Sequence, residues 1–175
     1  MKRCMALVCW LLAGGLLASG VVAQTQDSLA TAARVRTLLT QALEALRTDI
    51  DSSRVLAAMC YEESEKINSW SGQAEALRIT GIGYTLQGSY SEAEKRLLEA
   101  MRWYRTKQDS MGITRAHQAL GNMFYRQSDL ALAQENYEAA YAGFVAGAHQ
   151  AGQSQCLNNL GLVAWEQEDY PGAAR

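Results

Sequence analysis

A repeat with a period of 40 residues is the feature that most constrains what this chain can fold into. The clearest copy begins with the Leu-Gly pair at residues 120–121, and related pairs lie one period away on each side, at residues 80–81 and 160–161. A second glycine series keeps the same spacing: Gly72, Gly112 and Gly152. Self-similarity at a period of about 20–50 residues is typical of arrays of supersecondary units, none of which buries its apolar face alone. The period therefore predicts a solenoid.

Each period carries two helical patterns. Apolar residues recur at three- and four-residue steps, which predicts amphipathic helices, and the single Pro of the chain leaves little to interrupt them. The expected fold class is all-α, a right-handed α-solenoid of antiparallel helix pairs with about three and a half repeats. Its units are expected at residues 29–73, 74–113, 114–153 and, incomplete, 154–175, with exit loops over 68–72 and 147–152.

The first 23 residues have the three parts of a secretory signal peptide. Met1-Lys2-Arg3 is positive, residues 4–22 are uncharged and mostly apolar, and Ala23 ends a small-residue cleavage motif. We therefore expect cleavage between Ala23 and Gln24, a polar linker over 24–28, and a periplasmic or secreted product. The alternative is an uncleaved anchor in the inner membrane, because an apolar segment of about 20 residues spans a bilayer.

Charge and cysteine content narrow the functional classes. The part after residue 23 has 14 basic and 18 acidic residues, so no excess of positive charge indicates nucleic-acid binding. Cys60 and Cys156 lie more than two repeats apart, beyond the Cα separation of about 4–7 Å that a disulfide needs. We expect two buried small residues rather than a bridge, even in an oxidising compartment.

Residues suited to catalysis are scattered. His117 and His149 have no carboxylate or cysteine at metal-ligand spacing, and Glu62, Glu63 and Glu65 are typical of a solvated helix face. No glycine-rich phosphate loop follows a strand. We therefore expect no enzyme activity, no metal and no cofactor, with His117 packed or half-buried.

The repeated residues resemble the tetratricopeptide repeat (TPR) over about residues 30–175. The copy that fits best combines glycine and alanine with aromatic residues: Leu120, Gly121, Phe124, Ala133, Tyr137 and Ala140. The usual TPR period is about 34 residues, and the longer one here is similar to the subgroup seen in kinesin light chains and Pins-type spindle-orientation proteins. In this family, small residues let helices approach closely and aromatic rings fill the gaps.

The resemblance implies a non-catalytic scaffold that binds a protein or an extended peptide on a concave surface, without nucleic acid or a small-molecule cofactor. That surface is lined by the first helix of each pair, at Arg78, Ile82, Thr85, Gln118, Asn122, Tyr125, Asn158, Leu162 and Trp165. Asn122 and Asn159 match two asparagines of the family's carboxylate clamp, whereas Gln118 stands where a lysine is usual. A general peptide groove therefore fits better than a site for a C-terminal carboxylate.

The last residues suggest a second function. Residues 169–175 hold only the beginning of another helix, and solenoids end in a unit with a polar outer face. We therefore expect a fragment, or the N-terminal part of a longer protein. The alternative function is the extracytoplasmic sensor region of a membrane signalling protein, whose output would be a histidine kinase, a cyclase or a DNA-binding regulator. Attachment to the membrane would then come from an uncleaved signal or from a missing C-terminal part.

Overall fold

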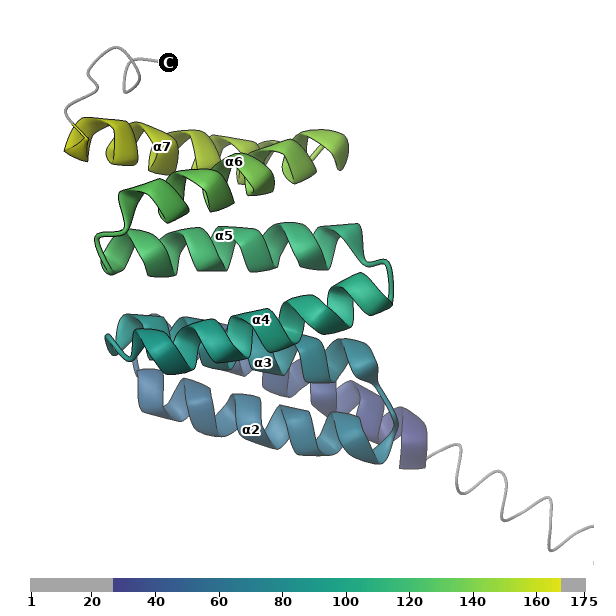
Figure 1. Cartoon of the computed structure of the whole chain (residues 1–175). Helices are drawn as coiled ribbons and strands as arrows, with labels where there is room; N and C mark the ends of the chain where they lie inside the picture. Colours follow the sequence, from purple (N-terminus) through teal and green to yellow (C-terminus); the bar gives the residue numbers. More distant parts are fainter. Residues whose placement is uncertain (1–26, 168–175) are drawn as a thin grey trace, which may run out of the picture.

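The computed structural model describes residues 27–167, and all regular structure in that range is α-helical. Residues 27–45 form the first helix, and neighbouring helices run in opposite directions (Figure 1). The others are α2 (Ile50–Lys66), α3 (Trp70–Leu86), α4 (Tyr90–Thr106), α5 (Ser110–Arg126), α6 (Leu130–Ala146) and α7 (Gln150–Glu166). Within the described range this gives three antiparallel pairs and one further helix, so the predicted α-solenoid is confirmed.

Three predicted segments fall wholly or partly outside the described range: the signal peptide, the linker over 24–28 and the incomplete unit over 154–175. The signal peptide over residues 1–23 lies outside it, as do residues 168–175. Of the predicted linker over 24–28, residues 27 and 28 are helical, so the linker prediction is wrong at that end. Within residues 27–167 no helix combines the length and the apolar character that crossing a membrane requires.

The 40-residue period has a simple structural origin. Each helix from α2 to α7 contains 17 residues, and three residues connect each to the next. Two helices with their two connections therefore make up one period. The repeat consists of two halves of equal length, which the sequence periodicity alone did not show.

The five connections between α2 and α7 share one backbone conformation. Their middle residues have positive φ: Asn68, Gly88, Gln108, Ser128 and Ala148. At the α4–α5 connection the N–H of Asp109 donates to the carbonyl of Tyr104 at 2.9 Å, which closes a Schellman turn. The Asp109 side chain then accepts the N–H of Gly112 at 2.9 Å and caps α5. The same three connecting residues thus end one helix and cap the next.

Helices α3 and α7 begin earlier than the apolar pattern predicted. The predicted starts were Ala74 and a point near Ser154, whereas the helices begin at Trp70 and Gln150. The predicted exit loops over 68–72 and 147–152 are therefore too long. The physical reason is capping: Ser69 and His149 accept the N–H groups of Gly72 and Gly152, at 3.3 and 2.9 Å. Both glycines consequently lie in a first helical turn, although their composition suggested a loop.

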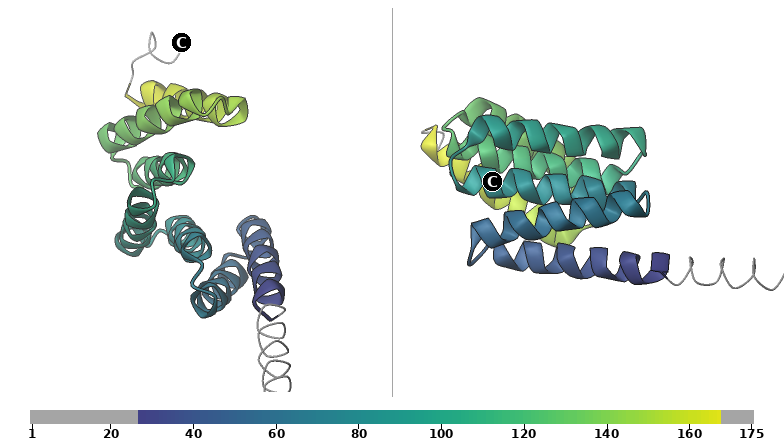
Figure 2. Two further views of the ribbon diagram at one scale, coloured as in Figure 1. Left: turned by 90° about the vertical axis from the view of Figure 1, so that its right-hand side faces the viewer. Right: turned by 90° about the horizontal axis from the view of Figure 1, so that it is seen from below.

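The helices form a zigzag stack with two sides. Viewed along the helices, α2 and α4 lie on one side and α3 and α5 on the other (Figure 2). Helix α3 also contacts α5 directly. We call the side of α3, α5 and α7 the inner face, and the side of α2, α4 and α6 the outer face.

Two buried tyrosines fill notches that glycines leave in α5. The Tyr137 ring of α6 is 2% exposed and packs on Gly121, where an added Cβ would lie 2.6 Å from the ring. The Tyr104 ring of α4 is 1% exposed and packs on Gly112, where a Cβ would lie 2.2 Å away. Any side chain at these two positions would push a ring outward. The predicted close approach of helices at Gly121 is therefore confirmed.

The two cysteines are both buried and unbridged, which confirms the expectation of two small buried residues. Burial raises the pKa of the Cys156 thiol to about 11 and also raises the pKa of Cys60. The thiolate is the reactive form of cysteine, so burial disfavours reaction of both thiols.

The notch at Gly121 gives a first testable prediction. Gly121→Leu should lower the free energy of unfolding by about 3 kcal/mol, because the added side chain overlaps the Tyr137 ring and forces α5 and α6 apart. Urea denaturation followed by circular dichroism measures this loss. Ala139→Leu, at an exposed position of α6, is the control and should change stability by less than about 0.5 kcal/mol. Equal stability of the two variants would contradict the packing described here.

The capped connections give a second prediction. Asp109→Ala should cost about 1 kcal/mol of unfolding free energy, because the N–H of Gly112 loses its acceptor. Ser89 precedes α4 at the equivalent position but makes no side-chain capping bond, so Ser89→Ala should leave stability almost unchanged. Thermal unfolding of the two variants side by side tests the difference. A larger loss for Ser89→Ala would show that the capping assignment is wrong.

Candidate functional site

A pocket of about 470 Å³ opens on the inner face. This volume lies within the range of about 300–1,000 Å³ that is usual for ligand pockets. Four helices contribute its lining: Ile82, Thr85 and Leu86 from α3, Ala119, Asn122, Tyr125 and Arg126 from α5, Tyr137 from α6, and Asn159 from α7. The structure thus brings together five residues of the predicted surface: Ile82, Thr85, Asn122, Tyr125 and Asn159.

A hydrogen-bonded chain fixes the orientation of the two asparagines. Oδ1 of Asn122 accepts the hydroxyl of Tyr137 at 2.8 Å and Nδ2 of Asn159 at 3.3 Å. Burial raises the pKa of Tyr137, so its hydroxyl remains a donor at neutral pH. Nδ2 of Asn122 and Oδ1 of Asn159 are bonded to no other group in the described part of the chain. The pair therefore offers one donor and one acceptor at the pocket.

The wall formed by α3 is apolar in character. Thr85 is buried, and its hydroxyl donates to the carbonyl of Gly81 in the same helix at 3.0 Å. Its polar group is therefore used within α3 and is not available to a ligand. Together with Ile82 and Leu86, Thr85 gives the pocket an apolar wall on α3, whereas the asparagine pair comes from α5 and α7.

The far end of the inner face is bridged from α5 to α7. The hydroxyl of Tyr125 donates to the carboxylate of Glu166, and this bond raises the pKa of Tyr125. Beside it on α7, Leu162 and Trp165 are exposed, and Trp165 keeps 62% of its surface accessible. The predicted surface therefore has an aromatic and apolar end next to the pocket.

Gln118 and Asn158 are two further predicted residues that lie outside the pocket. Nε2 of Gln118 donates to Oε1 of Gln155 at 3.1 Å, so this amide links α5 to α7. Asn158 is exposed on α7 and does not line the pocket. The predicted surface is therefore divided between the pocket and its surroundings.

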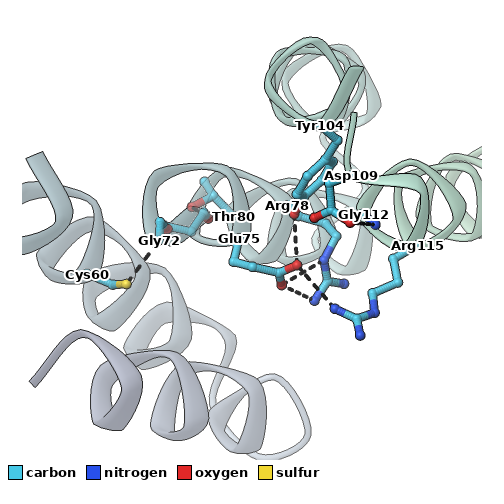
Figure 3. Close-up of polar contacts among 10 residues, drawn as sticks. Cys60, Gly72, Glu75, Arg78, Thr80, Tyr104, Asp109, Gly112 and Arg115 are labelled. Carbon is cyan, nitrogen blue, oxygen red and sulfur yellow. Dashed lines mark hydrogen bonds and ion pairs between the residues drawn. The ribbon is translucent and has the colours of Figure 1, made fainter. Parts of the chain in front are cut away.

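Arg78 belongs to a separate charged cluster. Its Nε and one terminal nitrogen bond to Oε2 of Glu75 at 3.1 and 2.7 Å. The other carboxylate oxygen of Glu75 accepts the hydroxyl of Tyr104 at 2.8 Å and lies 3.6 Å from a guanidinium nitrogen of Arg115. Figure 3 shows Glu75 at the centre of these three partners. Arg78 is thus occupied by an internal ion pair instead of standing open to a ligand.

The cluster holds Glu75 in its ionised form. Burial raises the pKa of Glu75, but the charge and hydrogen bonds of Arg78, the Tyr104 hydroxyl and Arg115 outweigh burial, so that the pKa lies below its usual value. Burial and the neighbouring Glu75 charge raise the pKa of Tyr104, which keeps its hydroxyl protonated. One carboxylate between two guanidinium groups leaves a net positive charge at this end of the inner face.

Sequence reasoning missed several members of these sites. The three-residue spacing of Glu75 and Arg78 on one helix was a usable signal for an ion pair. Tyr104, Tyr137 and Arg115 reach the inner-face clusters from other helices. A repeat pattern gives Tyr137 a packing role but does not indicate that its hydroxyl meets Asn122.

The remaining candidates have ordinary structural roles. His117 is half-buried, as expected, with Nδ1 3.0 Å from Oδ1 of Asn136. Glu62 and Glu65 are exposed, whereas Glu63 lies 3.0 Å from the ammonium of Lys66. Among the described side chains, no group of three or more His, Cys, Asp or Glu residues is placed to hold a metal ion.

Comparison with known proteins supports the architecture. No protein-family model matches the chain, and no curated protein matches it in sequence. The crystal structure of BtubC (BKLC) from P. vanneervenii is similar in fold, with a TM-score of 0.64 and 18% sequence identity. The similarity covers 80% of this chain and 59% of that one, so this chain spans less than two thirds of the length of BtubC. At this identity the likeness shows the fold alone, a helical-repeat solenoid.

The charged cluster gives a prediction with a defined pH dependence. Glu75→Gln should lower the free energy of unfolding by about 3 kcal/mol at pH 7, because Arg78 would remain buried without its counter-charge. The pKa of Glu75 is lowered in the folded chain, so its contribution is complete above the usual glutamate value of about 4.3. That contribution is lost as the pH falls through the lowered pKa.

The difference in stability between wild type and Glu75→Gln should therefore narrow on acidification, and urea denaturation at pH 7 and at about pH 3 measures it. Glu94→Gln is the matched control, because Glu94 is exposed on α4 and its substitution should cost less than about 0.5 kcal/mol. A difference for Glu75→Gln that stays constant with pH would rule out the ionised network.

Proposed function

We propose that this chain is a non-catalytic scaffold that binds an extended segment of a protein or peptide along its inner face. The observation that carries the proposal is the pocket of about 470 Å³ that is lined both by the Asn122–Asn159 pair and by an apolar wall from α3. A single apolar side chain of a ligand fits such a wall, and the amides would hold the adjoining main chain.

The free positions of the two amides support this reading. A peptide group carries one C=O and one N–H, and the asparagine pair leaves one donor and one acceptor without an internal partner. Because Tyr137 and Asn159 both donate to Oδ1 of Asn122, the Nδ2 of Asn122 is directed away from them. Tyr137 acts as a positioning residue in this proposal: it would set which amide binds the ligand C=O.

The arrangement of the wider inner face is consistent with an extended ligand. Tyr125 lines the pocket, and Leu162 and Trp165 are exposed nearer the end of α7. Exposed aromatic residues beside polar groups often provide the anchor contacts of protein interfaces. In the other direction, the cluster of Glu75, Arg78 and Arg115 has a net positive charge, and the partly exposed Arg115 favours an acidic residue in the ligand.

We also propose that the repeats are of the TPR type and that the chain is exported. The support for the repeat type is the placement of Gly121, Tyr137 and their neighbours, and the support for export is the composition of residues 1–23. A sensor region of a membrane signalling protein remains the alternative. The mass and cellular location of the product expressed from its native reading frame distinguish the scaffold from the sensor. A species of residues 24–175 in the cell envelope supports the scaffold. A larger, membrane-bound species supports the sensor.

Peptide binding can be tested with a random-peptide phage library selected on the wild-type chain. For a selected peptide, Asn122→Ala should weaken binding about tenfold or more, since it removes the donor to the ligand main chain. Tyr137→Phe should weaken binding less, because it leaves the amide in place without its fixed orientation. Fluorescence polarisation measures the affinity, and circular dichroism should show unchanged helicity for Asn122→Ala.

Asn158→Ala is the control for this experiment, because Asn158 is an exposed asparagine of α7 outside the pocket. It should bind the selected peptide as tightly as the wild type. Selection of no peptide, or peptides that bind Asn122→Ala as well as the wild type, would overturn the proposed site. Loss of helicity in Asn122→Ala would show that this residue serves the fold instead.

A further inference from the structure

Helix α4 presents a stripe of cations on the outer face. Lys95, Leu98, Arg102 and Arg105 follow one another at steps of three, four and three residues, which places them on one side of the helix. Together with Met101 they line a hollow of about 430 Å³, and Leu98 is 43% exposed. Within residues 27–167 none of the three cations forms an ion pair. The stripe is therefore an uncompensated positive surface around an apolar centre.

Helix α2 carries a complementary stripe at the equivalent repeat positions. Val55, Ala58, Glu62 and Glu65 stand 40 residues before the four members of the α4 stripe, and all four are exposed. Val55 is 60% exposed, and neither Glu62 nor Glu65 has an ion-pair partner in the part of the chain that the structure describes. Glu62 and Glu65 thus correspond to Arg102 and Arg105, and Ala58 corresponds to Leu98, whereas the counterpart of Lys95 is the apolar Val55.

The two stripes do not neutralise each other within one chain. A groove of about 300 Å³ lies between α2 and α4, with α3 at its floor. Helix α2 contributes Tyr61 and Glu62 to its lining, and α4 contributes Arg96 and Glu99. Arg96 is used by its own helix, with a nitrogen 3.2 Å from Glu99. Both helices run in the same direction on the outer face (Figure 1). Their charged sides are consequently left to solvent, or to a second molecule.

We propose that the partner of this surface is a second copy of the chain, packed outer face to outer face. A twofold axis parallel to the helices keeps their direction and reverses the order of the stack. It therefore places α2 of each copy against α4 of the other. Residues that are 40 positions apart in the sequence then lie at the same level along the helix axes. Glu62 and Glu65 of one copy then meet Arg102 and Arg105 of the second copy, and Ala58 meets Leu98.

Charge selects this pairing over its alternatives. Pairing α4 with its own copy would oppose Arg102 and Arg105 to the same cations, and pairing α2 with its own copy would oppose Glu62 and Glu65 to themselves. The cross-pairing occurs twice in a symmetric dimer, because an isologous interface repeats every contact. Since the contacts are mainly ionic and near the surface, the dimer should dissociate as salt shortens the Debye length from about 10 Å at 0.1 M to about 3 Å at 1 M.

Such a dimer would leave the two inner faces on opposite sides of the assembly. Each copy would keep its pocket open, so the dimer would be a bivalent scaffold for any ligand that carries two binding segments. This consequence rests on the proposed peptide binding, but the dimer itself does not. The pocket and the stripes lie on different faces, so failure of one leaves the other intact.

Charge reversal tests the pairing. Sedimentation equilibrium of the full chain should show a dimer whose dissociation constant rises with salt. The variant Glu62→Arg/Glu65→Arg and the variant Arg102→Glu/Arg105→Glu should each raise that constant about tenfold or more, because like charges then meet. An equimolar mixture of the two variants should restore the dimer, because both cross-pairs are again opposite in charge.

Two controls complete the experiment. Glu135→Arg/Glu138→Arg makes the same change of charge on α6 of the outer face and should leave the dimer unchanged. A loss of the dimer in this variant would mean that α4 pairs with α6, which would overturn the proposal. If either double variant loses helicity, the quadruple variant that carries all four substitutions should recover both the fold and the dimer, because its α2 and α4 again have opposite charges. A wild-type chain that stays monomeric up to about 1 mM, or a mixture that does not recombine, would also overturn it.

Discussion

The contact between a tyrosine ring and a bare glycine backbone is the interaction on which the rest of this structure depends. Tyr104 and Tyr137 come from successive outer-face helices, and each lies where a Cβ on α5 would have to be. The absence of that Cβ sets the distance between the helices. The same two rings carry hydroxyl groups to Glu75 and Asn122 on the inner face. Packing and the orientation of the candidate site therefore have one cause, and a change at either glycine should affect both.

The two faces of the array differ in how their polar groups are used. On the inner face several side chains bond to a neighbouring helix, as Gln118 does to Gln155 and Tyr125 to Glu166. In the pocket, the amide atoms left for a ligand lie on the Asn122–Asn159 pair, and Arg126 adds a guanidinium group to the lining. On the outer face the stripe of α4 is charged and unpaired within the described residues. Recognition on the inner face should thus rest on a fixed geometry, and on the outer face on charge, which salt screens.

The periodicity of the sequence was sufficient to predict the helical-repeat architecture, because equivalent residues make equivalent packing contacts in each repeat. It was insufficient at the helix starts, where Ser69 and His149 cap helices whose first turns contain glycine. It also placed Arg78 on the ligand-facing surface without its partner. The ion pair with Glu75 could have been inferred from their spacing, but the Tyr104 hydroxyl that completes the network comes from the next helix. Long-range contacts of this kind leave no periodic signal.

By itself the sequence determined an all-helical array of paired units, the glycine and aromatic positions that join them, and a surface on which Asn122, Tyr125 and Asn159 would lie. Periodicity and residue size carry that information, because close packing admits few residue types at each repeated position. Only the tertiary structure decided which polar groups are consumed internally and which remain available. That outcome depends on distances of about 3 Å between atoms of different helices, and such distances exist only once the helices have been stacked.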